Sequence, residues 1–282
     1  MNISALFRAK ARIQLKEADA SLRLLEDRDE SKDDKKDDRK NDSKQSDKLA
    51  TLDLAEKIAE FQNILYGQKK HKLLIILQGM DTSGKDGTVR GVFGQINPLG
   101  ARTAAFKAPS AVELDHDYLW RVHQEVPVRG EVVIFNRSHY EDVLITRVHE
   151  WITAAECQRR FVQIRDFERM LSETGTVILK FFLHISKDTQ KQRLEERLAD
   201  PEKHWKFDPR DLVERKSWES YQEAYADAIM ATDADHAPWY IIPADSKTQR
   251  NLAIAHIVIE KMESMKLSFP PGNPDYSKIK VT

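Results

Sequence analysis

The sequence has little cysteine, no long apolar run and almost no net charge, and each shortage excludes a class of protein. A single cysteine, Cys157, excludes an intrachain disulfide framework and a zinc site built from cysteines. The longest apolar stretches, at 73–77 and 177–185, are about half of the roughly 18 residues that a transmembrane helix needs. The N-terminal residues lack the continuous apolar core of a signal peptide. We therefore expect a cytoplasmic protein with no membrane partner.

The sequence also has no excess of charge of one sign, because 45 Lys and Arg residues balance 46 Asp and Glu residues and the formal net charge is −1. Domains that bind nucleic acids are typically strongly basic, so we expect no nucleic-acid partner. What the sequence does contain is apolar residues, which make up 40% of its 282 positions. A chain of this size and composition can bury a substantial core.

The chain divides into four parts by composition. Residues 3–25 place apolar side chains at helical spacing and predict an N-terminal helix within 1–26. The segment 27–48 holds eight basic and nine acidic residues and no hydrophobic one. It predicts a charged, solvated linker or a frayed, salt-bridged helix, since it has no apolar surface to bury. We expect one domain at 49–264, followed by a C-terminal tail at 265–282.

Within that domain, apolar runs alternate with helical patterns. Strands are predicted at 72–78, 101–107, 131–136, 176–186 and 238–244. Helices are predicted at 49–67, from Lys85, through Leu114 and Trp120, at 140–144, at 154–171, after the fourth strand, and at 247–264. Strands that are apolar throughout and flanked by helices are typical of a parallel sheet covered on both faces. We therefore predict a three-layer α/β domain with about five strands.

The strongest local motif is the glycine-rich segment GMDTSGKDGT at 79–88, which follows the first predicted strand and opens a helix. Glycines let the backbone wrap around an anion, N–H groups at the helix start donate to it, and Lys85 adds positive charge. The segment predicts a phosphate-binding loop; the alternative is a glycine-rich turn without a ligand. Its predicted phosphate-binding residues are Thr82, Ser83, Gly84, Asp86, Gly87 and Thr88.

The loop departs from the usual G-x-x-x-x-G-K-S/T pattern, because Asp86 replaces the hydroxyl residue that normally binds magnesium. Asp81 is the natural substitute, since Mg²⁺ prefers carboxylate oxygens. The third predicted strand ends at Asn136 and Arg137, which should lie beside the loop at the carboxyl edge of the sheet. Asn136 is a candidate second metal ligand, and Arg137 offers a charged fork to phosphate oxygens or, alternatively, forms a salt bridge.

A charged helix follows the fourth predicted strand. Arg193 and Arg197 are four residues apart and therefore lie on one helical face. With Lys203, Lys206 and Arg210 they predict a basic ledge on a lid at about 187–215 that would close over phosphates. The alternative is an ordinary solvent-facing helix.

Taken together, these segments resemble the polyphosphate kinase 2 family, P-loop kinase-like enzymes that phosphorylate nucleotides with inorganic polyphosphate. The resemblance runs from about Leu52 to Lys247 and rests on several motifs in a fixed order: GMDTSGKDGT, AFKAPSAVELDHDYLWR, IFNRSHYEDVL, HWKF, WESYQEAY and APWYIIPAD. It is closest to the subgroup that accepts both nucleoside mono- and diphosphates. The family resemblance implies a homodimer or homotetramer.

The resemblance also implies roles for the residues named above. Polyphosphate would thread along Lys85, Arg137, Arg193 and Arg197, while Mg²⁺, or Mn²⁺ in its place, would be held by Asp81 and Asn136. In phosphoryl transfer the protein mainly positions groups and stabilises charge, so a loop, a metal and lid arginines suffice. AMP and ADP, or GMP and GDP, would be the acceptors.

The acceptor pocket is predicted from four residues. Lys107, at the end of the second predicted strand, would hold an acceptor phosphate, and Phe106 would stack on a base or, alternatively, belong to the core. Arg121 and Glu141 complete the predicted nucleotide-binding set. Two other functions remain open from the sequence: an ATP-dependent nucleoside monophosphate kinase, and a non-catalytic module that binds polyphosphate.

Overall fold

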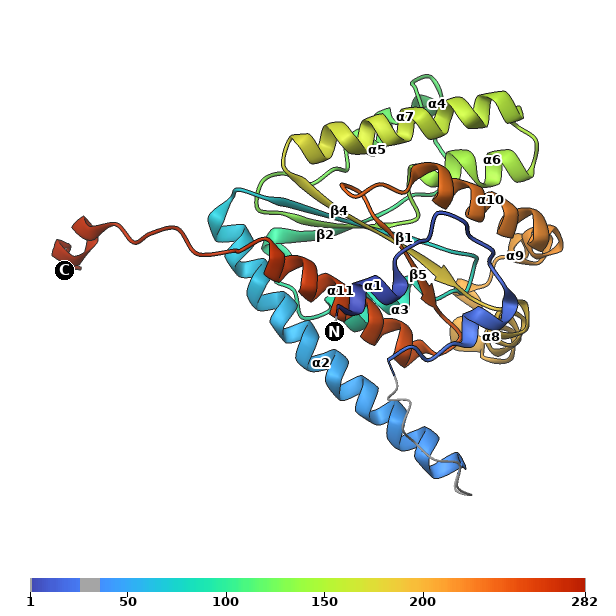
Figure 1. The fold of residues 1–282 in the computed structure, drawn as a ribbon, viewed down its shortest axis with the longest axis horizontal. Coiled ribbons are helices and arrows are strands. Elements are labelled where there is room, and N and C mark those ends of the chain that lie inside the picture. The colour runs from blue at the N-terminus through green and yellow to red at the C-terminus, as the bar shows by residue number, and fades with distance from the viewer. Residues whose placement is uncertain (1, 26–35, 282) are drawn as a thin grey trace.

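The computed structural model describes residues 2–25 and 36–281 of the chain. A five-stranded sheet lies at its centre, with the strand order β2-β3-β1-β4-β5 (Figure 1). All four neighbouring pairs are parallel. The strands are β1 (Lys72–Gln78), β2 (Ala101–Ala105), β3 (Val132–Asn136), β4 (Thr176–His184) and β5 (Trp239–Pro243). The predicted parallel sheet of about five strands is confirmed.

Helices cover both faces of this sheet, so the three-layer prediction is also confirmed (Figure 1). One face carries α2 (Lys36–Gln68), α3 (Lys85–Phe93) and α11 (Lys247–Ser264). The other carries α7 (Ala154–Glu173) and α10 (Trp218–Thr232), with α4 (Ala111–Leu114), α5 (Trp120–His123) and α6 (Ile145–Val148) nearby. The apolar residues Leu73–Leu77 of β1 are almost fully buried because helices pack on both of their sides.

The carboxyl edge of the sheet carries the functional segments. The glycine-rich loop joins β1 to α3, and the 3₁₀ helix η3 (His139–Val143) follows β3. The predicted lid follows β4 and consists of α8 (Lys187–Ala199), η4 (Pro201–Lys206), α9 (Arg210–Glu214) and η5 (Arg215–Ser217). Among the described residues, no helix combines the length and apolar character needed to cross a membrane.

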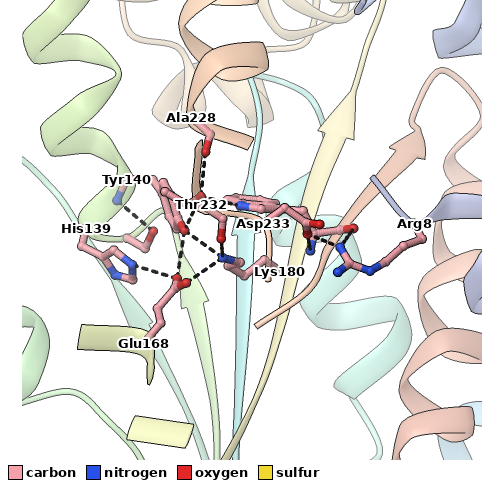
Figure 2. A network of polar contacts seen from close by, with 10 residues as sticks. Arg8, His139, Tyr140, Glu168, Lys180, Ala228, Thr232 and Asp233 are labelled. Carbon is pink, nitrogen blue, oxygen red and sulfur yellow. Dashed lines mark hydrogen bonds and ion pairs between the residues drawn. The ribbon is translucent and has the colours of Figure 1, made fainter. Parts of the chain in front are cut away.

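A buried polar network supports the segment after β3 (Figure 2). Lys180 Nζ donates to Glu168 Oε2 at 2.6 Å, to the Tyr140 hydroxyl at 3.0 Å and to the Thr232 carbonyl at 2.8 Å. The imidazole of His139 lies 3.3 Å from the other oxygen of Glu168. Lys180 and Glu168 are at most 1% exposed, so each needs the other to offset the cost of burying a charge. The network ties η3 to β4, α7 and α10.

The predicted N-terminal helix over 3–25 is wrong. The structure has only the short helix α1 (Ile3–Phe7) and the 3₁₀ helix η1 (Glu17–Ser21), with extended chain between them. Arg8 forms an antiparallel bridge with Tyr240, and the Ala9 amide donates to the Trp239 carbonyl at 2.9 Å. Since β5 is an edge strand with unpaired backbone groups, pairing with it competes with helix formation.

The predicted linker at 27–48 is only partly open to comparison, because residues 26–35 lie outside the described residues. From Lys36 onward the segment is the first part of α2, so the helical alternative is the one found there. Asp47 is 7% exposed and accepts hydrogen bonds from Thr248 Oγ1 and Gln249 Nε2, both at 2.8 Å. Asp47, which belongs to the charged segment 27–48, therefore anchors α2 to α11.

Candidate active site

The loop at 79–88 wraps around the end of β1 with a backbone that only certain residues tolerate. Gly79 and Gly84 have φ angles of +149° and +105°. A Cβ atom on Gly84 would lie 1.9 Å from Nη1 of Arg250, which is shorter than any van der Waals contact. Thr82 also adopts a left-handed conformation, with φ of +64°. These glycines allow the close turn that aims backbone N–H groups into the loop.

Lys85 lies inside the loop and is 8% exposed. Its Nζ donates to the carbonyls of Gly79 at 2.7 Å and Met80 at 3.2 Å. Burial, and then the nearby charge of Arg137, lower the pKa of Lys85, while Asp81 and Glu141 oppose this shift. An anion placed in the loop would favour the charged form of this lysine.

Two hydroxyl groups in the loop are buried without a partner. Within the part of the chain that the structure describes, Thr82 Oγ1 and Ser83 Oγ make no hydrogen bond. Buried polar atoms are normally satisfied, so such atoms beside a buried lysine fit a site for phosphate oxygens. Gly87 and Thr88 continue into the first turn of α3, where Thr88 Oγ1 contacts Asn251 Oδ1 at 3.5 Å.

Asp81 and Arg137 connect the loop to the end of β3. Arg137 Nη2 donates to Asp81 Oδ1 at 2.5 Å, and Arg137 is held in a left-handed backbone conformation with φ of +63°. Burial opposes the charge of Arg137, but Glu141 and Asp81 outweigh it and raise the pKa of this residue. Burial in turn raises the pKa of Glu141, against the effects of Arg137 and Lys85. The predicted proximity of these two chain segments is confirmed.

The candidate metal ligands lie at the same edge of the sheet. Asn136 Nδ2 donates to Asp86 Oδ1 at 2.7 Å, which links the end of β3 to the first turn of α3. In the described residues, no group of three or more histidine, cysteine, aspartate or glutamate side chains could hold a metal ion by itself. Mg²⁺ usually takes one or two carboxylates together with phosphate oxygens and water. Asp81 with Asn136 fits that donor set when a phosphate substrate supplies the remaining ligands.

Arg193 does not belong to the predicted basic ledge. Arg193 is 8% exposed, and its guanidinium donates to the carbonyls of Thr82 at 2.9 Å, Ala244 at 2.8 Å and Asp245 at 2.8 Å. Arg197 instead donates to the Lys206 carbonyl at 3.1 Å. Helical spacing places both arginines on one face, but backbone carbonyls of the loop bind the first of them. Arg193 therefore supports the loop from beneath.

Sequence reasoning missed Arg250, which lies below the same loop. It is 2% exposed, and its Nη1 donates to the Ser83 carbonyl at 3.2 Å. Burial, followed by repulsion from Arg193, lowers the pKa of Arg250 to about 9. Two neighbouring buried cations make the region under the loop favourable for an anion. Arg250 sits within the apolar pattern of α11, so no local signal marks it.

Comparison with known proteins places this site in a family. The family model described as Polyphosphate kinase 2 matches residues 40–270, which include the loop, the end of β3 and the lid. The chain belongs to the polyphosphate kinase 2 family. The predicted resemblance is confirmed.

Two relatives and one solved structure extend this result. The chain is 51% identical over 228 residues to the AMP/ADP-polyphosphate phosphotransferase of Meiothermus ruber, covering 81% of this chain and 85% of the relative. It is 43% identical over 231 residues to the ADP-polyphosphate phosphotransferase of Rhodopseudomonas palustris, covering 78% and 80%. The crystal structure of Polyphosphate Kinase 2 from Arthrobacter aurescens TC1 matches with a TM-score of 0.87 and 37% identity, over 99% and 95% of the two chains.

In this polyphosphate kinase 2 chain, three of the predicted nucleotide-binding residues lie together, Phe106, Lys107 and Arg121, and Glu141 lies apart from them. Phe106 is 7% exposed, and its ring packs edge-to-face on Phe135 with centroids 4.8 Å apart, so the core alternative describes it better. Arg121 is buried, lies 5.6 Å from the Phe106 ring centroid, and donates to the Lys107 carbonyl at 2.8 Å. Lys107 is exposed at the end of β2, while Glu141 lies with Lys85 and Arg137.

Proposed function

We propose that this chain transfers a phosphoryl group from inorganic polyphosphate to a nucleoside mono- or diphosphate at the loop 79–88. The observation that carries the proposal is the arrangement of Asp81, Lys85 and Arg137 around unpaired loop hydroxyls, in a chain of the polyphosphate kinase 2 family. The names of the Meiothermus and Rhodopseudomonas relatives support AMP and ADP as acceptors, and GMP and GDP are the guanine counterparts.

The reaction requires the protein mainly to position the reacting groups and to stabilise their negative charge. An oxygen of the acceptor phosphate forms a bond to the terminal phosphorus of polyphosphate, and the bond from that phosphorus to the next bridging oxygen breaks. The shortened polyphosphate leaves with the electron pair, so the reaction is balanced without a further reactant. Lys85 and Arg137 stabilise negative charge on the transferred group, and the loop amides fix its orientation.

Asp81 would bind the metal ion in this reaction. With Asn136 it would hold Mg²⁺, or Mn²⁺ in its place, and the metal would neutralise charge between donor and acceptor phosphates. In the structure Arg137 pairs with one oxygen of the Asp81 carboxylate, so metal binding there would compete with this ion pair. We also expect the protein to act in the cytoplasm as a homodimer or homotetramer.

The test uses the purified chain with Mg²⁺ and one acceptor at a time. Polyphosphate is incubated with AMP, ADP, GMP or GDP, and the nucleotides are separated by chromatography. We expect phosphorylated products with Mg²⁺ and no product when EDTA removes the metal. Binding of polyphosphate without any product would favour a non-catalytic module, and product formed only from ATP and AMP would favour a nucleoside monophosphate kinase.

A further inference from the structure

The N-terminal segment, residues 2–25, runs along β5 to the base of the lid, as the blue part of Figure 1 shows. His184 Nε2, at the end of β4, hydrogen bonds to the Lys16 carbonyl at 2.8 Å. The Asp245 amide, just after β5, donates to the Ala20 carbonyl at 3.1 Å. The 3₁₀ helix η1 therefore lies across the ends of the two strands that carry the lid and α11. All of this segment lies outside the family-model match at 40–270.

Glu17, the first residue of η1, contacts both ends of the lid at once. Its Oε2 accepts a hydrogen bond from the backbone amide of Lys187, the first residue of α8, at 2.8 Å. Its Oε1 accepts one from the indole Nε1 of Trp218, the first residue of α10, also at 2.8 Å. A carboxylate at the N-terminus of α8 also interacts favourably with the helix dipole. The two oxygens thus fix the distance between the place where the lid begins and the place where it ends.

The same two ends are linked to the phosphate loop. Arg215, three residues before Trp218, donates to the Lys187 carbonyl and to Gln190 Oε1, both at 2.7 Å. Gln190 Nε2 then donates to the carbonyl of Asp81 at 3.2 Å. A change in the spacing of the lid ends is therefore passed through Arg215 and Gln190 to the residue that carries the loop carboxylate.

We propose that Glu17 is a positioning residue for phosphoryl transfer, which it assists by holding the lid in the arrangement that contacts the loop. The proposal rests on the proposed function, because it assigns the lid to polyphosphate binding. A lid must open to admit a long anion and close on it. The Glu17 carboxylate accepts hydrogen bonds from both lid ends and therefore favours the closed arrangement. When the closed fraction falls, the apparent affinity for the ligand falls by the same factor.

The test compares wild type with Glu17→Gln, in which one oxygen that accepts a hydrogen bond becomes an amide that cannot. The KM for polyphosphate should rise about three- to tenfold, with kcat changed by less than about twofold, as expected for loss of one charge-assisted contact. Trypsin cleavage between Lys203 and Arg210, measured without substrates, should accelerate by a similar factor. Trp218→Phe, which removes the indole donor, should shift both quantities in the same direction.

Asp19→Asn is the matched control, because it removes the same charge from the same 3₁₀ turn. It should leave KM and lid cleavage at wild-type values. Unchanged KM and cleavage in Glu17→Gln would overturn the proposal, as would a fall in kcat and folded fraction at constant KM, which marks a purely structural role. The cleavage rate needs no turnover, so a wild-type protein inactive with polyphosphate would refute the proposed function while the cleavage comparison still decides the role of Glu17.

Discussion

The carboxylate of Asp81 and the guanidinium of Arg137 form an ion pair across 2.5 Å, and this contact joins the loop after β1 to the turn after β3. The side chain of Asp81 is 21% exposed and that of Arg137 is 38% exposed, so the pair lies at the surface of the loop, where a ligand can reach both groups. Binding of a metal by Asp81 and of phosphate by Arg137 would replace each partner with a stronger one.

Loss of the loop carboxylate or the loop lysine should reduce turnover much more than stability. Asp81→Asn and Lys85→Ala are each expected to lower kcat by about two to three orders of magnitude, because the first removes the proposed metal ligand and the second removes a positive charge beside the transferred group. Initial rates of ADP phosphorylation, with circular dichroism to confirm folding, provide the measurement. A wild-type rate in either folded variant would remove that residue from the site.

Two glycines of the loop should respond differently to the same substitution. Gly84→Ala should lower activity by at least about a hundredfold, since its φ is +105° and the new Cβ would collide with the Arg250 guanidinium. Gly87→Ala is the matched control, because its Cβ would lie 3.1 Å from the same guanidinium, a much smaller overlap, and its backbone is not left-handed. A loss within about tenfold is expected there. Equal rates in the two variants would contradict the described loop geometry.

Arg193 should matter for stability, whereas Arg197 should matter little for it. Arg193→Ala leaves the carbonyls of Thr82, Ala244 and Asp245 without their donor, and should lower the free energy of unfolding by about 2–4 kcal/mol. Arg197→Ala removes a partly exposed side chain with one backbone contact and one ion pair, to Asp211 at 3.5 Å, and should cost less than about 1 kcal/mol. Urea unfolding measures both, and equal midpoints would show that Arg193 does not support the loop.

The lid carboxylate of Asp211 should make stability depend on pH. Burial, and then the nearby Asp81 carboxylate, raise the pKa of Asp211 to about 6, whereas an unfolded aspartate titrates near 3.9. Between these values the folded state binds more protons, so the free energy of unfolding falls as pH rises from about 4 to about 6. Asp211→Asn should remove on the order of 1 to 2 kcal/mol of that fall.

Urea unfolding at pH 4 and pH 7, in EDTA, compares wild type with this variant. In the folded state both side chains are uncharged at pH 4, so the two stabilities should differ least there and diverge at pH 7. An identical pH dependence in the two proteins would contradict the raised pKa.

The elements that the sequence predicted best are those with a dense run of apolar residues. The strand at 72–78 and the helix at 247–264 coincide with β1 and α11, because helices cover both sides of the first strand and most residues of the helix are buried. The phosphate loop was predicted because its backbone requires glycines at fixed positions. Local rules of this kind can be read without knowing which segments meet.

What the sequence did not reveal depends on contacts between distant segments. The roles of Arg193 and Arg250 come from backbone carbonyls of the loop, which leave no pattern in the residues that contact them. The apolar spacing of the N-terminal segment suggested a helix, but its backbone pairs with the edge strand β5 instead. Phe106 follows a strand end, where a ligand could reach it, yet its ring packs on Phe135.

Phosphoryl transfer from polyphosphate at the loop 79–88 can be tested by one comparison of initial rates. ATP formation from ADP and polyphosphate is measured beside ADP formation from AMP and ATP, with the same Mg²⁺ and the same enzyme preparation. We predict that the polyphosphate reaction is faster by at least about a hundredfold and is lost in Lys85→Ala. A faster ATP-dependent reaction, or a polyphosphate reaction that survives in Lys85→Ala, would contradict it.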